Sequence, residues 1–522
     1  MNRRLVVPLV VAASACIISR GVQVEPLLRS AKDDGIYVVT PVKAHLIDGS
    51  TVLFPGGVRV ERDTVWGAGT RYGLALLDSS RVAVLLLDSV VGMEVYRTQV
   101  NPGRTLVYST LATIGAIATG VVIACATDPK CFGSCPTYYA DSAGTYVLEA
   151  EGFSYSIAPL FEARDVDRLR FPVGPDGIVR LEVRNEAFET HYINHLELLE
   201  VRHAAGEIAL PDERNQPFVV SHVAAALRAV DRAGRDVRRQ LTLADGEVYR
   251  TDEQVLARAQ GEGEDLEDWI ELAVGPPPAG ADSVAVVLRL RNSLLNTILF
   301  YDIMLGDPGA RSLDWVGRDL QQVGPAVELA QWYQRRMGMG IAVRDRGTWR
   351  PVARLKDTGP VAWKDVAIAV PVLERDSVRI RLSFPADNWR IDRVAVAGRF
   401  RRLAAGPLVH PLAAVRDAAE RLDPAALANM AAADQRYLET TAGQRFSAEF
   451  RTGPAPADGV RTFLLGSQGY YTEWVRNGWL TAPRADRTFV PSDAALSEAI
   501  ARWRVTQDTL EARFMATRVP VR

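Results

Sequence analysis

Three of the four cysteines in this 522-residue chain lie close together. They are Cys125, Cys131 and Cys135, and the last two flank the turn-like sequence FGS. Two sulfurs with this spacing can form a disulfide, which persists in an oxidising compartment. Free structural thiols are one alternative. A metal centre is another, although the spacing is not that of a zinc ribbon and no histidine lies nearby. The cysteines favour a disulfide on the oxidising side of a membrane.

A second group of candidate ligands is the sequence HYINHLELLEVRH. On a continuous strand His191, His195 and His203 would share one face. Two of them together with Glu189 could hold a divalent metal. The first two, however, would lie ~13 Å apart along an extended strand, too far to share one ion unless a bulge or a helical turn intervenes. We therefore expect surface or hydrogen-bonding histidines and no metal site.

Paired carboxylates are the remaining catalytic candidates. Asp165 and Asp167 would share one face of a strand, as a salt-bridged strand end, a calcium site or an acid pair. With Asp387 or Asp392 they define an alternative function, a glycan-acting or other hydrolytic enzyme. The sequence LGSQG misses the Gly-x-Ser-x-Gly elbow by one residue, and no phosphate loop or dinucleotide motif occurs. No catalytic residue and no cofactor is predicted.

Tryptophans beside charged residues are candidate ligand contacts, namely Trp389 with Asp392, and Trp474. The pattern RIRLSF…NWRIDRVAVAG, within residues 379–398, is similar to the closing strands of jelly-roll modules of the galactose-binding-like kind. Modules of that kind often bind glycans or other proteins. Alternation places Trp389 on the face of Ile391 and opposite Val394. We favour that face as core, which makes Trp389 structural; the alternative is a solvent-facing binding residue.

The N-terminus, MNRRLVVPLVVAASAC, has the parts of an export signal: two arginines, an apolar centre and small residues before a cysteine. AASAC resembles the lipobox of bacterial lipoproteins. In that class the cysteine, here Cys16, becomes the lipidated first residue of the mature chain. The resemblance therefore implies that residues 1–16 are a signal peptide with a lipobox-like end. A plain cleaved signal without lipid is the alternative.

The segment 105–126 is a membrane-segment candidate. Leu106–Cys125 contains no charged residue, and a helix of that length would reach ~30 Å, about the thickness of the hydrocarbon core. Arg97 and Arg104 precede it, which places its N-terminal flank in the cytoplasm, whereas an export signal places that flank outside. Two topologies follow: an extracytoplasmic body with a buried or membrane-dipping helix, or a signal anchor with residues 1–104 inside. We prefer the first.

Alternating apolar residues and turn sequences predict a mainly β, multidomain chain with an α-rich C-terminal part. The predicted modules are a small SH3-like or Sm-like barrel (35–104), a β-sandwich with a helical insertion near 221–262 (137–310), a jelly-roll-like β module (340–400) and a helical region (405–522).

Local patterns predict individual elements within these modules. Helices are expected over 221–239, 410–422, 423–438 with Asp423 as its N-cap, and 492–515, and another opened by Pro325. Paired strands are expected over 177–203 and again over 282–305, and a hairpin turn at Asp48.

The composition is that of an ordinary folded protein: 48% hydrophobic, 24% charged and net charge −2. Charges of both signs are interspersed, so no field favours nucleic acid. The prediction is a non-enzymatic, membrane-associated bacterial envelope protein with its body on the extracytoplasmic side. Its partners would be membrane lipid, through Cys16 and the 106–125 segment, and envelope proteins or glycans.

Overall fold

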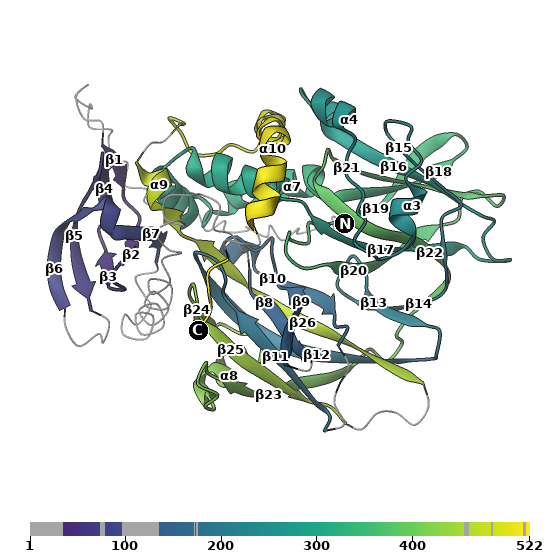
Figure 1. The fold of residues 1–522 in the computed structure, drawn as a ribbon, viewed down its shortest axis with the longest axis horizontal. Coiled ribbons are helices and arrows are strands. Elements are labelled where there is room, and N and C mark those ends of the chain that lie inside the picture. The colour runs from purple at the N-terminus through teal and green to yellow at the C-terminus, as the bar shows by residue number, and fades with distance from the viewer. Residues whose placement is uncertain are drawn as a thin grey trace, which may run out of the picture. The chain divides into compact units, whose positions relative to one another are not determined.

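The computed structural model describes residues 35–73, 79–96, 135–142, 144–171, 173, 176–453, 459–481, 484–514 and 518–522 (Figure 1). All 27 strands of the described residues belong to four sheets, and a long helix lies near the C-terminus. The predicted fold class, a mainly β chain with sandwich-like sheets and helix at its C-terminal end, is confirmed.

The N-terminal sheet is strongly curled. Its strand β5 bends where Gly67 and Gly69 lie against Phe54, since a Cβ at either glycine would come within 3 Å of that ring. The two halves of β5 therefore pair with different strands, β4 and β3. The hairpin predicted at Asp48 joins β2 to β3. The sheet contains β1 (Ile36–Val38), β4 (Val58–Glu61), β5 (Thr64–Tyr72), β3 (Thr51–Phe54), β2 (Val42–Leu46), β7 (Val90–Val95) and β27 (Val475–Arg476), with β6 (Ser79–Leu86) on β5.

A nine-stranded sheet combines strands from residues 137–203 with strands from residues 408–473. In sheet order it contains β10 (Ala163–Arg168), β26 (Val460–Glu473), β12 (Glu189–His203), β23 (Leu408–Arg416), β25 (Arg445–Arg451), β11 (Ile178–Arg184), β8 (Thr137–Ser142) and β9 (Thr145–Glu151), with β24 (Leu438–Thr440) on β12. The predicted pair over 177–203 is two strands, but β11 pairs with β8 and β25 while β12 pairs with β26. Long-range pairing thus replaces the expected hairpin.

Two five-stranded sheets share one apolar core and form a sandwich. One contains β13 (Ile208–Pro211), β14 (Pro217–Ala225), β22 (Trp389–Arg402), β17 (Ser283–Asn292) and β20 (Lys364–Pro371). The other, called the outer sheet below, contains β15 (Arg228–Asp231), β16 (Glu267–Val274), β21 (Val378–Pro385), β18 (Met339–Asp345) and β19 (Thr348–Leu355). Leu288 and Ile368 of the first sheet and Ile270, Ile341 and Ile380 of the outer sheet belong to the same buried cluster.

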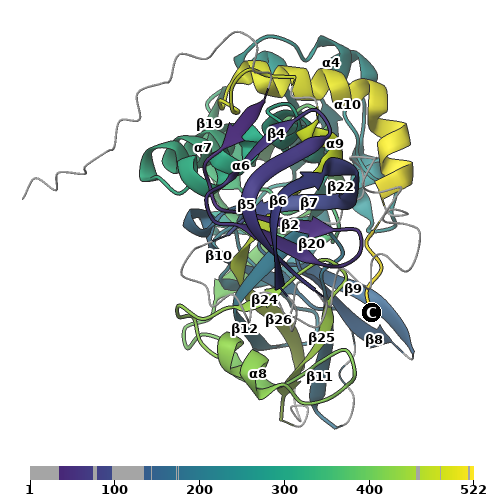
Figure 2. The same cartoon turned by 90° about the vertical axis from the view of Figure 1, so that its left-hand side faces the viewer.

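Most helices lie in the segments between β15 and β16 and between β17 and β18, and near the C-terminus. The helix α10 packs on α5, η4 and α4. Figure 2 shows α10 beside α4. No helix in the described ranges is both long and apolar enough to span a bilayer. The helices are η1 (Leu87–Ser89), η2 (Pro159–Phe161), α3 (Arg238–Thr242), α4 (Glu253–Arg258), η3 (Gly263–Leu266), α5 (Leu295–Thr297), the π-helical η4 (Ile298–Gly306), α6 (Arg311–Asp314), the π-helical η5 (Trp315–Asp319), α7 (Val323–Arg336), α8 (Pro424–Met430), α9 (Asn477–Leu480) and α10 (Asp493–Phe514).

Three expected elements differ in secondary structure from the prediction: two expected helices contain strands, and half of one expected strand pair is helical. Residues 221–239 form the end of β14, then β15 and the start of α3, because their apolar spacing fits two strands as well as a helix. Residues 410–422 lie mainly in β23, where pairing with β12 and β25 overrides the helix propensity of alanine. The second half of 282–305 is helical, since a continuous apolar run does not distinguish a buried strand from a buried helix.

One helix follows the prediction closely, and two others need a correction. The helix expected over 423–438 is α8, which already ends at Met430, since residues 431–437 are not helical and β24 begins at Leu438. The side chain of Asp423 accepts a hydrogen bond from the backbone N–H of Ala426 and caps α8. The amphipathic helix expected over 492–515 is α10. The helix expected to open at Pro325 is α7, which begins two residues earlier at Val323.

Candidate ligand-binding site

A cavity of about 610 Å³ lies between the nine-stranded sheet, the helical segment and the outer sheet. Its walls come from the loop between β9 and β10, from α5 and η4, from α7, and from β19 with the loop that follows it. The rim is exposed and includes Leu160, Arg214 and Lys356, whereas the floor is buried and includes Asp357 and Phe300. The cavity therefore leads from solvent to a buried carboxyl group.

Three asparagine amides hold that carboxyl group. Asn292 Nδ2 and Asn388 Nδ2 donate to Asp357 Oδ1 at 3.1 and 3.3 Å, and Asn296 Nδ2 donates to Asp357 Oδ2 at 3.1 Å. Asn292 is the last residue of β17, and Asn388 directly precedes β22, whose first residue, Trp389, is opposite Asn292. The sandwich thus positions the donors, and the loop after β19 brings the acid to them.

Burial raises the pKa of Asp357 to about 7, although the hydrogen bonds from Asn292 and Asn388 oppose the change. A group with this pKa changes charge near neutral pH. Titratable groups with such shifts at the bottom of a cavity are typical of functional sites, although ion-pair networks also produce them.

A polar chain connects Asp357 to the wall of the cavity. Tyr333 Oη donates to Asn296 Oδ1 at 2.8 Å, and Asn296 donates in turn to Asp357. Burial and the charge of Asp357 raise the pKa of Tyr333, so its phenol stays protonated and remains a donor. The rim carries a positive charge, because Lys356 Nζ lies there, 5.3 Å from the centre of the Tyr155 ring. Apolar and aromatic side chains, among them Phe161 and Leu329, form much of the remaining wall.

The two ligand-contact candidates on β22 lie in the interior instead. Trp389 is 0% exposed and belongs to the sandwich core, so the core interpretation of this residue is correct. Ile391, Val394 and Val396 belong to the same cluster, contrary to the alternation expected from sequence. The reason is a bulge at Asp392, where the register against β17 shifts by one residue.

Asp392 is buried and bound within the protein. Its Oδ2 accepts from Arg289 Nε at 2.9 Å, and its Oδ1 accepts from the backbone N–H of Gly246 at 3.0 Å. It has no free face for sugar hydroxyls.

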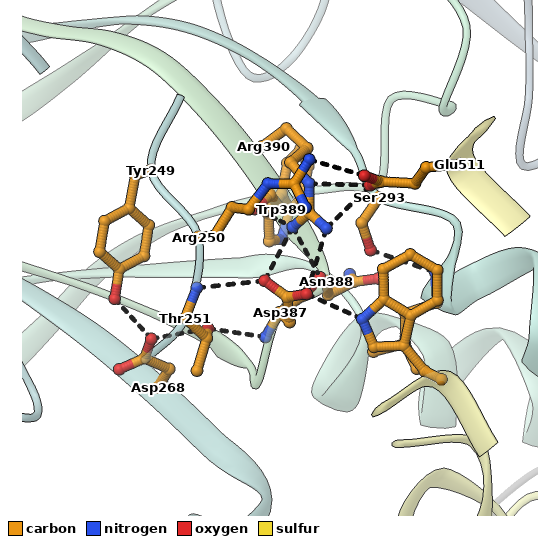
Figure 3. Close-up of polar contacts among 12 residues, drawn as sticks. Tyr249, Arg250, Thr251, Asp268, Ser293, Asp387, Asn388, Trp389, Arg390 and Glu511 are labelled. Carbon is orange, nitrogen blue, oxygen red and sulfur yellow. Dashed lines mark hydrogen bonds and ion pairs between the residues drawn. The ribbon is translucent and has the colours of Figure 1, made fainter. Parts of the chain in front are cut away.

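Asp387 connects the sandwich to the C-terminal helix (Figure 3). It accepts from Arg390 Nη1 at 2.8 Å, from the Trp503 indole at 2.8 Å and from the backbone N–H of Thr251 at 3.1 Å. Arg390 also binds Glu511 of α10 at 2.9 Å. These contacts give Asp387 a structural role.

The third ligand-contact candidate, Trp474, is 1% exposed and lies against the N-terminal sheet. Its ring stacks on His45 with centroids 3.8 Å apart, and its indole donates to Thr190 Oγ1 at 3.0 Å. Glu94 accepts from Lys43 at 2.5 Å and contacts His45 at 2.9 Å. Although burial works against ionisation, Lys43 and His45 lower the pKa of Glu94 to about 2. This cluster joins the N-terminal sheet to the nine-stranded sheet.

Asp165 and Asp167 do lie close together, and both form ion pairs with the same lysine. Lys364 Nζ lies 2.5 Å from Asp165 Oδ1 and 3.1 Å from Asp167 Oδ1, and all three side chains are buried. Burial, assisted by the charge of Asp165, raises the pKa of Asp167 to about 7, while Lys364 opposes the change. The three residues join β10 of the nine-stranded sheet to β20 of the sandwich.

A bulge at Asn194 separates the histidines of β12. Beyond it the alternation of faces reverses, so His191 and His195 do not share a face. His191 Nε2 lies 2.5 Å from Glu189 Oε1, and burial lowers the pKa of this histidine to about 3. His203 contacts Thr462 at 2.8 Å. No group of three or more metal-ligating side chains in the described part of the chain has a geometry that could hold an ion.

The remaining predicted residues lie mostly outside the described ranges. Cys16, Cys125, Cys131 and the apolar segment 106–125 are among them. Cys135 is buried, and its backbone N–H donates to Glu189 Oε1 at 2.6 Å. The disulfide therefore stays a prediction.

Sequence reasoning missed Asp357, Asn296 and Tyr333, the residues that define the cavity floor. A usable signal exists for two of their neighbours. Asn292 and Asn388 stand at the ends of apolar strands, where a buried amide requires a specific partner.

No protein-family model and no curated protein sequence matches the chain. Among solved structures it is similar to an allantoicase, with 12% identity over 50% of this chain and 88% of that one and a TM-score of 0.17. It is also similar to the GH31 alpha-xylosidase from Xanthomonas citri, with 9% identity over 85% and 38% and a TM-score of 0.15. A carbohydrate-binding module of the β-sandwich superfamily has 8% identity over 50% and 84% and a TM-score of 0.11. Likenesses this low indicate neither a shared fold nor a shared function.

Proposed function

We propose that this chain is a non-enzymatic binding protein of the bacterial cell envelope, and that its ligand occupies the cavity above Asp357. The lining carries the proposal: an apolar and aromatic wall faces a buried carboxyl group held by three amides. Sites for small molecules combine an apolar wall with a few oriented polar groups in this way. The ligand class that fits is a saccharide or related polyol, whose ring packs on aromatic side chains while its hydroxyls bond carboxylates and amides.

The alternative of a hydrolytic enzyme has less support. The four carboxylates named for it are buried, bound to basic side chains and absent from the cavity lining; they are Asp165, Asp167, Asp387 and Asp392. Glu162 does line the cavity, but it accepts hydrogen bonds from Tyr437 and Gln468.

Asp357→Asn should weaken saccharide binding by about tenfold or more, because a hydrogen bond to a charged group contributes about 1.5–3 kcal/mol. Affinity of the parent should rise between about pH 6 and pH 8, since the ionised carboxylate, whose pKa is about 7, is the better acceptor of ligand hydroxyls. Titration calorimetry with galactose, N-acetylglucosamine and their short oligomers measures both effects.

Two matched variants control this experiment. Asp508→Asn makes the same chemical change on the exposed side of α10, and Tyr146→Ala is the exposed counterpart of Tyr155→Ala at the rim. Neither control should alter affinity, whereas Tyr155→Ala should reduce it. The binding proposal is contradicted if no saccharide binds to the parent, and release of reducing ends from a bound oligomer would make the chain an enzyme.

Attachment to the membrane is proposed to occur through lipid on Cys16, on the basis of the AASAC sequence. Cells grown with radiolabelled palmitate should label the parent chain, and Cys16→Ser should abolish the label. Equal labelling of both chains would exclude this site.

A further inference from the structure

The outward face of the outer sheet carries a row of arginines across its strands. Arg228 of β15 is opposite Ala273 of β16, and Ala273 is opposite Arg379 of β21. Val343 of β18 pairs with Ile380, so Arg344 comes beside Arg379 at the next position, and Trp349 of β19 is opposite Arg344. All these side chains alternate with core residues and therefore point away from the core.

These three arginines differ from most in the sandwich. Arg289 and Arg381, for example, are ion-paired with Asp392 and Glu271. Within the described residues the side chains of Arg228, Arg344 and Arg379 form no ion pair and donate no hydrogen bond. Arg228 and Arg379 are exposed, and Arg344 is half-buried. The row therefore has positive charge that the protein itself does not neutralise.

Two arginine side chains of this face lie over tryptophan rings. The Arg381 guanidinium lies 5.0 Å from the Trp269 ring and 4.5 Å from the Trp349 ring, and Arg344 lies 5.6 Å from Trp349. The edge of the Arg381 guanidinium donates to Glu271, whereas stacking leaves the N–H groups at the edge of the Arg344 guanidinium free. Such edges match the geometry of a carboxylate or a sulfate.

We propose that this surface binds an acidic polysaccharide, independently of the cavity. The surface, called the arginine face, consists of Arg228, Arg344, Arg379, Arg381, Trp269 and Trp349. Adjacent strands lie about 4.8 Å apart, so the row offers anion contacts at intervals of one and two strands. Small residues, Ala273 and Ala342, lie between the arginines and leave the face flat enough for sugar rings.

The side chains of this face favour a polysaccharide over other anionic partners. A membrane surface would need exposed aliphatic or aromatic groups to enter the lipid, but both tryptophans are half-buried and stacked. An acidic peptide in extended form gains its main-chain hydrogen bonds at a sheet edge, whereas the arginines lie across the face. The chain as a whole has net charge −2, so general attraction to polyanions does not account for binding.

The test uses the full chain, purified in a non-ionic detergent, with oligogalacturonate as the probe. The parent should bind it, and binding should weaken as salt increases because exposed charges are screened. The triple variant Arg228→Gln, Arg344→Gln, Arg379→Gln should lose at least tenfold in affinity. The methyl ester of the same oligomer, which lacks the charge, should not bind.

A second triple variant provides the matched control. Arg81→Gln, Arg399→Gln and Arg451→Gln remove the same charge from exposed arginines of other sheets that lack ion pairs in the described structure. This control should bind like the parent, and both variants should keep the parent's melting temperature. Equal loss in both variants, no binding by the parent, or stronger binding to polyglutamate or to phosphatidylglycerol vesicles would each overturn the proposal.

Discussion

Lys364→Met is expected to destabilise the protein by about 3–5 kcal/mol, because it leaves two buried carboxylates without their cation. Lys364 Nζ lies 2.5 Å from Asp165 Oδ1 and 3.1 Å from Asp167 Oδ1, and all three side chains are buried. The midpoint of urea unfolding, followed by tryptophan fluorescence, measures the loss. Lys356→Met, at an exposed lysine nearby, should change stability by less than about 0.5 kcal/mol.

Neutralising the two acids should restore most of this loss. In the triple variant Lys364→Met, Asp165→Asn, Asp167→Asn no buried charge remains, and replacing a whole buried ionic group by neutral residues is often close to neutral for stability. A triple variant as unstable as the single one would show that packing, not charge, explains the effect.

The deficit of Lys364→Met should also depend on pH. The pKa of Asp167 is about 7 in the folded protein, above its ordinary value of 3.8. Between these values the folded state binds more protons than the unfolded state, so stability falls as pH rises from about 4 to about 7. Loss of Lys364 raises the folded-state pKa further. The variant should therefore be closest to the parent near pH 5 and furthest from it near pH 8, and a constant deficit would contradict this account.

Trp389→Ala should cost about 3–5 kcal/mol, because it empties a large site in a packed core. Trp389 is 0% exposed and belongs to the buried apolar cluster that the two five-stranded sheets share. Trp66→Ala is the matched control at a tryptophan that is 47% exposed, and it should cost less than about 1 kcal/mol. Urea unfolding of the two variants measures both values.

The result for Trp389 distinguishes core packing from ligand contact. Saccharide affinity of the folded Trp389→Ala variant should equal that of the parent, since this residue does not line the cavity. A Trp389→Ala variant with unchanged stability would contradict the buried position of the indole.

Local sequence patterns determined those elements whose signals lie within a few residues. The hairpin at Asp48 and the cap at Asp423 follow from side chains that bond their own neighbouring backbone. The amphipathic stripe of α10 and the β character of most of the chain follow from the periodicity of apolar residues.

Tertiary structure decided the elements that local patterns leave open. Alanine-rich 410–422 is a strand because β12 and β25 pair with it. A single extra residue at Asn194 and another at Asp392 reverse the alternation of faces. These bulges depend on the partner strands, so parity counting along one strand cannot reveal them.

The candidate site illustrates the same limit most fully. Residues near 160, 214, 296–301, 329–334 and 352–360 meet at one cavity, and strand ends from β17 and β22 supply the amides around Asp357. No spacing along the chain relates these segments. Their positions result from sheet pairing between residues far apart in sequence, which also aligns Arg228, Arg344 and Arg379 in one row. The sequence thus determined which residues are available for chemistry, and only the packing of sheets decided which of them meet.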